Sequence, residues 1–146
     1  MVVRTQAGTH QSDLARVMAA GIRAGGLVSL SVAEPLPQAL RAALLGAGVE
    51  VAVERGAVWE ARLSDMASSG ALGVRVRIVG DRRVPSEELW QQASALTGGS
   101  PDVALYTGPV TTCPHTELLT FLREQAVAIT SHRFGTPLDL AEGLLH

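Results

Sequence analysis

Stretches with the apolar spacing of helices alternate with short apolar runs along this chain, and no other feature constrains its fold as much. The expected helices cover residues 12–24, 36–45, 57–68, 85–97, 114–124 and 137–145. The expected strands cover residues 27–32, 49–53, 73–79, 103–106 and 126–130. Such alternation is typical of a parallel sheet whose crossover helices lie on both faces. The sequence therefore predicts an α/β, Rossmann-like fold with an open, mostly parallel five-stranded sheet.

One domain accounts for most of the 146 residues, a length that suits a single hydrophobic core. Hydrophobic residues make up 47% of the chain and aromatic residues only 3%, so the core must consist of Ala, Val, Leu and Ile. Residues 12–146 are assigned to this domain. Residues 1–11 show no periodicity, so we interpret them as a tail or linker, and we expect Ser12 to cap the first helix.

The run 73–79 alternates strictly between apolar and basic side chains, with Arg75 and Arg77 on one face. Period-two alternation indicates a strand with one less buried face, as at the edge of a sheet. Arg82 and Arg83 follow in the next turn. Because no aromatic residues are interleaved with these arginines, we interpret them as a solvated edge strand and turn rather than a nucleic-acid surface.

Charge and cysteine content narrow the class of protein. Twelve basic residues against 14 acidic ones give a formal charge of −2, which gives no reason to expect nucleic acid or an anionic membrane as partner. The single cysteine, Cys113, cannot form an internal disulfide, which favours a reducing compartment. The first four residues lack the apolar core of a signal peptide, and no apolar run approaches the roughly 18 residues that span a bilayer. We therefore expect a soluble, cytoplasmic protein.

Two short motifs have the composition of phosphate-binding loops. Residues 46–48 (Gly-Ala-Gly) follow a helix and precede a strand, the reverse of a dinucleotide fingerprint, so we interpret them as a helix stop. Residues 107–109 (Thr-Gly-Pro) lie at the carboxyl end of a strand, where open α/β sheets bind ligands. Hydroxyl groups of Thr107, Thr111 and Thr112 are able to bind a phosphate there. A Gly-Pro turn followed by a helix capped by Thr112 explains the same residues and is favoured.

Cys113 and His115 are the next candidates for chemistry. A catalytic thiolate–imidazole pair needs both side chains within hydrogen-bond reach and a third group that orients them. A cysteine at the start of a helix is more often a small packing residue, so we favour no catalytic role. A zinc site needs three or four ligands, and His132 is the only other histidine of the expected domain before the terminal His146, so no metal site is predicted.

The segment 121–137 places polar side chains on both sides of an apolar strand, with Phe134 directly after them. The polar residues are Arg123, Glu124, Gln125, Ser131, His132 and Arg133. A polar bracket around an anchoring aromatic side chain suits a docking surface. A loop at the end of a sheet with a core phenylalanine accounts for the same pattern equally well.

The end of the chain closely resembles a known family. The segments FLREQAVAITSHRFGTP and, before it, PDVALYTGPV are similar to the end of long proline utilization A proteins, over residues 101–145. These are bifunctional enzymes that combine a flavin-dependent proline dehydrogenase with a glutamate-semialdehyde (pyrroline-5-carboxylate) dehydrogenase. The long forms end in an additional domain of the aldehyde dehydrogenase superfamily, which lacks catalytic function.

A second segment, AAGIRAGGLVSLSVAEPLP at residues 19–37, resembles the nucleotide-binding region of aldehyde dehydrogenases. Ser31 stands where that family has its cofactor-binding lysine, and Glu34 matches its glutamate. Cys113 lies outside the Gly-Gln-X-Cys context of the family's nucleophile, and the Glu-Leu-Gly-Gly-Lys motif of the general base has no counterpart. The resemblance implies a domain with no catalytic residue, cofactor or metal of its own, in a parent enzyme that uses FAD and NAD.

In that family such a domain packs on the semialdehyde dehydrogenase module of the same polypeptide and helps enclose the path of the intermediate. The resemblance thus implies that the tail motif contacts that module. The implied interface residues are Arg123, Glu124, Gln125, Ser131, His132, Arg133, Phe134, Gly135, Thr136 and Pro137. Two alternatives remain open: a nucleotide-binding module at residues 107–112, and a freestanding domain that forms homo-oligomers through its own edge strand.

Overall fold

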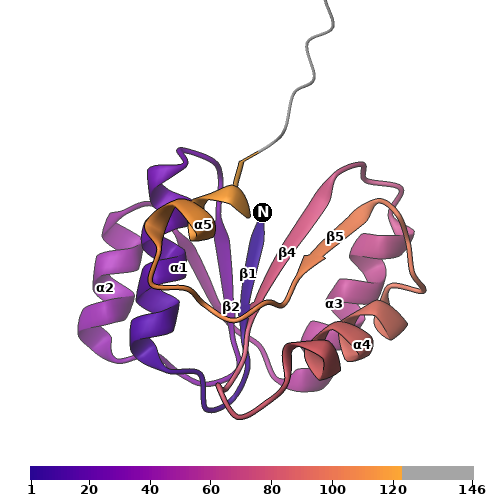
Figure 1. The fold of residues 1–146 in the computed structure, drawn as a ribbon, viewed down its shortest axis with the longest axis horizontal. Helices are drawn as coiled ribbons and strands as arrows, with labels where there is room; N and C mark the ends of the chain where they lie inside the picture. The colour runs from indigo at the N-terminus through magenta and orange to yellow at the C-terminus, as the bar shows by residue number, and fades with distance from the viewer. Residues whose placement is uncertain (123–146) are drawn as a thin grey trace, which may run out of the picture.

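Strands and helices alternate in the computed structural model, which describes residues 1–122 (Figure 1). The strands are β1 (Val2–Thr5), β2 (Ser29–Val32), β3 (Glu50–Val53), β4 (Val74–Val79) and β5 (Val103–Tyr106). The helices are α1 (Gln11–Arg23), α2 (Gln38–Gly46), α3 (Gly56–Ser68), α4 (Ser86–Leu96) and α5 (Pro114–Leu119). The expected strand 126–130 and helix 137–145 lie outside the described residues.

The five strands form one parallel sheet in the order β3-β2-β1-β4-β5. This arrangement confirms the α/β, Rossmann-like fold. β1 is the central strand, since Val3 pairs with Leu30 of β2 on one side and with Arg77 of β4 on the other. The interpretation of residues 1–11 as a tail is therefore wrong. Four residues are too few to show a periodicity, and all four residues of β1 are buried.

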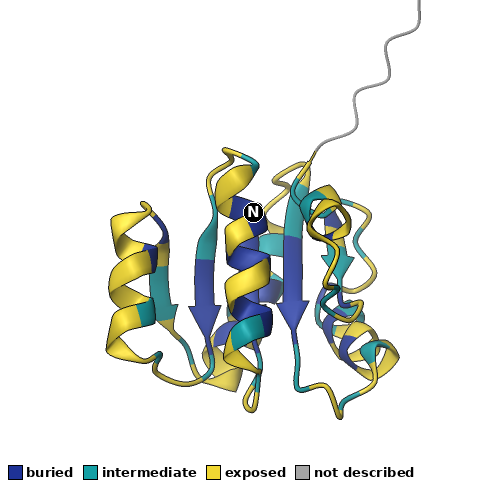
Figure 2. Cartoon of the chain, turned by 60° about the vertical axis from the view of Figure 1, so that its left-hand side comes forward, coloured by how far each residue is buried: buried dark blue, intermediate teal, exposed yellow. Residues whose placement is uncertain are grey.

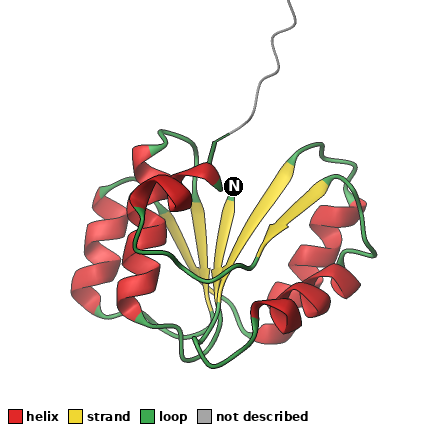
Figure 3. Ribbon diagram, in the orientation of Figure 1, coloured by secondary structure: helices red, strands yellow, loops and turns green. Residues whose placement is uncertain are grey.

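Helices cover the two faces of the sheet as separate layers (Figure 3). On one face, α1 packs against β1 and β2 through a cluster that includes Leu14, Val17 and Met18. On the other face, α3 and α4 pack against β4 and β5 around Trp59 and Leu63. Buried residues lie on the strands and the inner faces of the helices, while the outer helix faces are exposed (Figure 2). The core is largely aliphatic, as the low aromatic content predicts.

The position of β4 corrects the expectation of an edge strand at 73–79. β4 lies between β1 and β5, and the edges of the described sheet are β3 and β5. Arg77 is only 2% exposed although the alternation places it on the more polar face of the strand. A buried partner, Glu117 of α5, accounts for this charge in the interior.

The last described helix, α5, lies on the same face of the sheet as α1 and packs against it. It ends at Leu119, several residues before the expected end near 124. The chain then places Phe121 against Gly21 of α1, where a Cβ atom would lie 2.6 Å from the Phe121 ring. Gly21 therefore permits the close approach of the chain end to α1.

Candidate functional site

Sheets of this order bind ligands at the carboxyl ends of the strands, in the crevice where the strand order reverses. In this chain the reversal lies between β1 and β4, which pair directly although α1, β2, α2, β3 and α3 separate them in sequence. The crevice is flanked by the loop from β1 to α1 and the loop from β4 to α4. The two loops lie close together at Gly8 and Asp81. A Cβ atom on Gly8 would lie only 2.7 Å from Oδ2 of Asp81.

The amino end of α1, where a dinucleotide would place its pyrophosphate, carries a carboxylate of the chain itself. Asp13 lies in the first turn of α1 and is 4% exposed. Arg82 reaches it from the β4–α4 loop, and its Nε and Nη2 donate to Oδ2 and Oδ1 at 2.7 Å each. The hydrogen bond from Arg82 is the largest cause of the lowered pKa of Asp13. The ion pair thus joins the two loops across the crevice.

Two further polar side chains of the crevice, His10 and Asp81, are also paired within the chain. His10 is the residue that caps α1, and its Nδ1 accepts from the Ser12 backbone N–H at 3.4 Å, which corrects the assignment of the cap to Ser12. Asp81 accepts from Arg83, and this hydrogen bonding lowers the pKa of Asp81 to about 2. Two carboxylates therefore lie between the loops that would have to receive a phosphate, and each is neutralised by an arginine.

Residues 107–110 border a cavity of about 310 Å³ beside this crevice. In the residues that follow, the backbone N–H of Thr111 donates to Glu117 Oε1 at 2.7 Å, and the hydroxyl of Thr111 donates to the Cys113 carbonyl at 3.1 Å. The residue that caps α5 is Cys113 rather than Thr112, and no side-chain hydrogen bond forms there. A phosphate in this cavity would approach the carboxylate of Asp13, which lines it as well.

Arg77 and Glu117 form a buried ion pair behind this segment, with Nη2 to Oε2 at 3.3 Å. Arg77 also donates to the carbonyl of Gly108 at 2.7 Å, so the pair holds the chain after β5 against α5. The sequence analysis placed Arg77 on a solvated edge strand and did not single out Glu117, so it missed the pair. One signal in the sequence could have indicated the pair. Glu117 lies three positions after Pro114, which begins α5, and β4 carries a basic face that needs an acidic partner.

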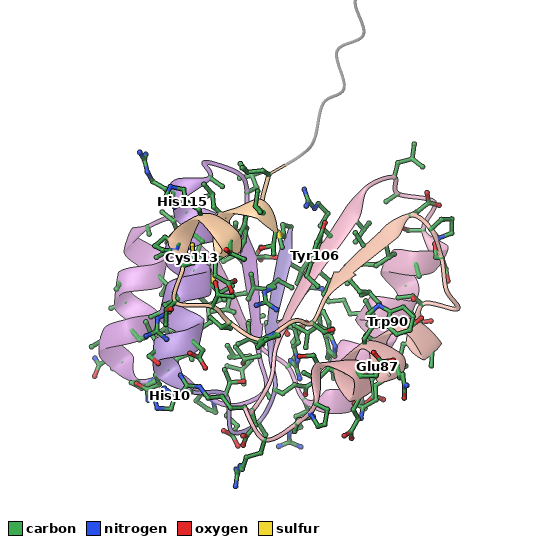
Figure 4. All side chains as sticks on the ribbon, in the orientation of Figure 1. His10, Glu87, Trp90, Tyr106, Cys113 and His115 are labelled. Carbon is green, nitrogen blue, oxygen red and sulfur yellow. The ribbon has the colours of Figure 1, made fainter. Side chains whose placement is uncertain are left out.

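Cys113 and His115 both lie at the start of α5 (Figure 4). The thiol of Cys113 is exposed, and hydrogen bonds from the Thr116 side chain and backbone, followed by that of the His115 backbone, lower its pKa. The His115 imidazole is not among these causes. Within residues 1–122, no three His, Cys, Asp or Glu side chains form a group that could hold a metal ion.

The segment that resembles a nucleotide-binding region forms the end of α1 and β2. Ser31 is fully buried in β2, where its hydroxyl accepts from Arg4 at 2.8 Å and donates to Glu54 at 2.5 Å. It therefore lies in the interior rather than in a cleft. The Gly46–Gly48 motif ends α2, and Gly48 has a φ of +79°, as expected for a helix stop.

All ten residues of the expected interface, from Arg123 to Pro137, lie outside the described residues. No family model, curated protein or solved structure matches this chain. No helix in the described part of the chain is long and apolar enough to cross a membrane.

Proposed function

We propose that this chain is a non-catalytic domain of a bifunctional proline-catabolic enzyme, which docks on the semialdehyde dehydrogenase module and helps enclose the path of the intermediate. The proposal starts from the resemblance of residues 101–145. The observation that carries it furthest is the Asp13–Arg82 ion pair, at 2.7 Å, across the ligand crevice of the fold. A pyrophosphate would have to displace Arg82 and then lie beside a carboxylate.

The residues of this chain that correspond to functional positions of a dehydrogenase also favour a non-catalytic role. The cofactor lysine of the aldehyde dehydrogenases is replaced by Ser31, which lies in the core. The only cysteine, Cys113, is exposed on α5, and its hydrogen bonds come from Thr116 and a backbone N–H. A nucleophile needs an oriented base beside it. These features favour a role in shape and docking.

The position of α5 favours docking by the residues that follow it. The helix that connects β4 to β5 lies on the α3 face, whereas α5 lies on the α1 face. A right-handed crossover to a further parallel strand beside β5 needs a helix on the α3 face. α5 is therefore poorly placed to lead into such a strand, and the apolar run 126–130 remains available to pair with a sheet or flap of another module.

The proposal is tested in the full-length bifunctional enzyme with Arg133→Ala and Phe134→Ala. An arginine or aromatic anchor at an interface typically contributes more than 1 kcal/mol, so we expect nicotinamide reduction by the semialdehyde dehydrogenase to fall by about tenfold. Proline oxidation, followed as flavin reduction, should change little. Arg41→Ala serves as the control, because Arg41 is exposed on α2. Equal activities in both variants and the control would contradict the docking role.

A further inference from the structure

A groove of about 770 Å³ lies on the part of the sheet that α1 and α5 leave uncovered. β4 and β5 form its floor, and the residues after α5 form one wall. Its lining residues are Gly73, Val74, Arg75, Pro101, Asp102, Ala104, Tyr106, Leu119 and Leu122. Parallel sheets are normally covered by helices on both faces, and within residues 1–122 no helix covers this face of β4 and β5 at the groove.

The chemistry of the groove is apolar at the rim and basic at the floor. Leu119 is 65% exposed and Leu122 is 42% exposed, and both line the groove. On the floor, the guanidinium of Arg75 lies 5.1 Å from the centre of the Tyr106 ring, and its Nη2 donates to the Tyr106 hydroxyl at 2.6 Å. The Nε of Arg75 is buried and has no hydrogen-bond partner among the described residues. An aliphatic surface that carries a carboxylate would complement both features.

The described chain ends in this groove. The carbonyl of Leu122 accepts a hydrogen bond from Arg75, which holds the last described residue at the groove. Twenty-four residues follow, and the sequence predicts a helix at 137–145 among them. In that helix Leu138, Ala141 and Leu145 would share one face, and Asp139 and Glu142 would lie together beside it.

We propose that residues 138–145 of the same chain cover this groove. A helix of eight residues is about 12 Å long. β4 has six residues and β5 has four, and at a rise of about 3.3 Å per residue both strands are at least as long as that helix. The link, residues 123–137, is long enough to leave and return, because seven extended residues in each direction reach about 25 Å. The link starts directly after Leu122 at the groove, so the effective concentration of residues 138–145 there exceeds that of a free partner.

This docking gives the segment 123–137 two fixed ends. A loop held at both ends loses less conformational freedom when it binds a partner than a free tail does. The residues proposed to reach the dehydrogenase module would thus be presented in a restricted arrangement. The groove assignment itself does not depend on that proposed function, since it concerns only contacts within the chain.

A disulfide-trapping experiment on the 146-residue chain tests the groove assignment. Cys113→Ser removes the native thiol, after which Ala104→Cys places a thiol in the groove and Ala141→Cys places one on the expected helix. With oxidised glutathione added as the oxidant, we expect an intramolecular disulfide between these two thiols to form at least ten times faster than in the matched control, which carries Ala47→Cys in place of Ala104→Cys. Ala47 is exposed at the end of α2, outside the groove.

Two further variants make the assignment specific. Leu119→Asp should slow the trapping reaction, whereas Leu27→Asp should not, because Leu27 is exposed but does not line the groove. A disulfide that links two chains would instead assign the groove to a second copy and overturn the proposal. A rate equal to that of the Ala47→Cys control would overturn it as well.

Discussion

At the scale of single residues, the two arginines of β4 have different surroundings although they alternate with the same apolar neighbours. Arg77 is buried against Glu117, while Arg75 lies in the open groove beside Tyr106. Alternation indicates on which face a side chain lies, but not what covers that face. The covering element for Arg77 is α5, about forty residues later in the chain, and no local pattern reveals that contact.

The Arg77–Glu117 pair gives a prediction at this scale. Removing one member of a buried ion pair leaves an uncompensated charge, which typically destabilises a fold by about 3–5 kcal/mol. We expect Glu117→Gln to cause a loss of that order in urea unfolding, followed by fluorescence of the buried Trp59.

The double variant Arg77→Met, Glu117→Leu is the matched control, because it removes both charges and keeps side-chain volume. It should lose clearly less stability than Glu117→Gln. If the double variant is as unstable as the single variant, the pair acts through packing alone, contrary to this description.

At the scale of elements, the sequence predicts the alternation, the parallel sheet and the approximate position of four of the five described strands. These strands follow helices whose apolar spacing and glycine stops define the boundaries between them. The prediction fails at β1, because Val2–Thr5 contains an arginine and is too short to show a pattern. Arg4 is buried there because Ser31, Glu54 and the ring of Trp59 contact its guanidinium.

β1 also gives the prediction for this scale. Deleting residues 1–5 should abolish folding, because β1 pairs with β2 and β4 and contributes to both cores. Far-ultraviolet circular dichroism and solubility report the outcome. Deleting residues 138–146 is the control, since it leaves all five described strands in place. A folded, cooperative protein without residues 1–5 would restore the interpretation of this segment as a tail.

At the scale of the whole molecule, the two ends of the sheet differ in character. The carboxyl end, where this fold binds ligands, is bridged by the Asp13–Arg82 pair and carries carboxylates that are neutralised within the chain. The amino end of β4 and β5 borders the groove, where Leu119 and Leu122 are exposed. A ligand site at the carboxyl ends of the strands could be expected from the predicted parallel sheet, but its position between β1 and β4 could not, because the sequence predicted neither β1 nor the strand order. The ion pair that bridges the crevice could not be predicted either, because Asp13 and Arg82 are 69 positions apart in the sequence.

We propose that this domain acts through shape and binds no nucleotide. Calorimetric titration of the purified 146-residue chain with NAD tests this proposal on the domain alone. We expect no saturable heat at NAD concentrations up to about 1 mM. A dissociation constant of about 1 mM corresponds to a binding free energy of only about −4 kcal/mol. An active aldehyde dehydrogenase under the same conditions is the positive control. Saturable binding by the wild-type chain, weakened by a substitution at Thr107, would contradict the claim and favour the nucleotide-binding module.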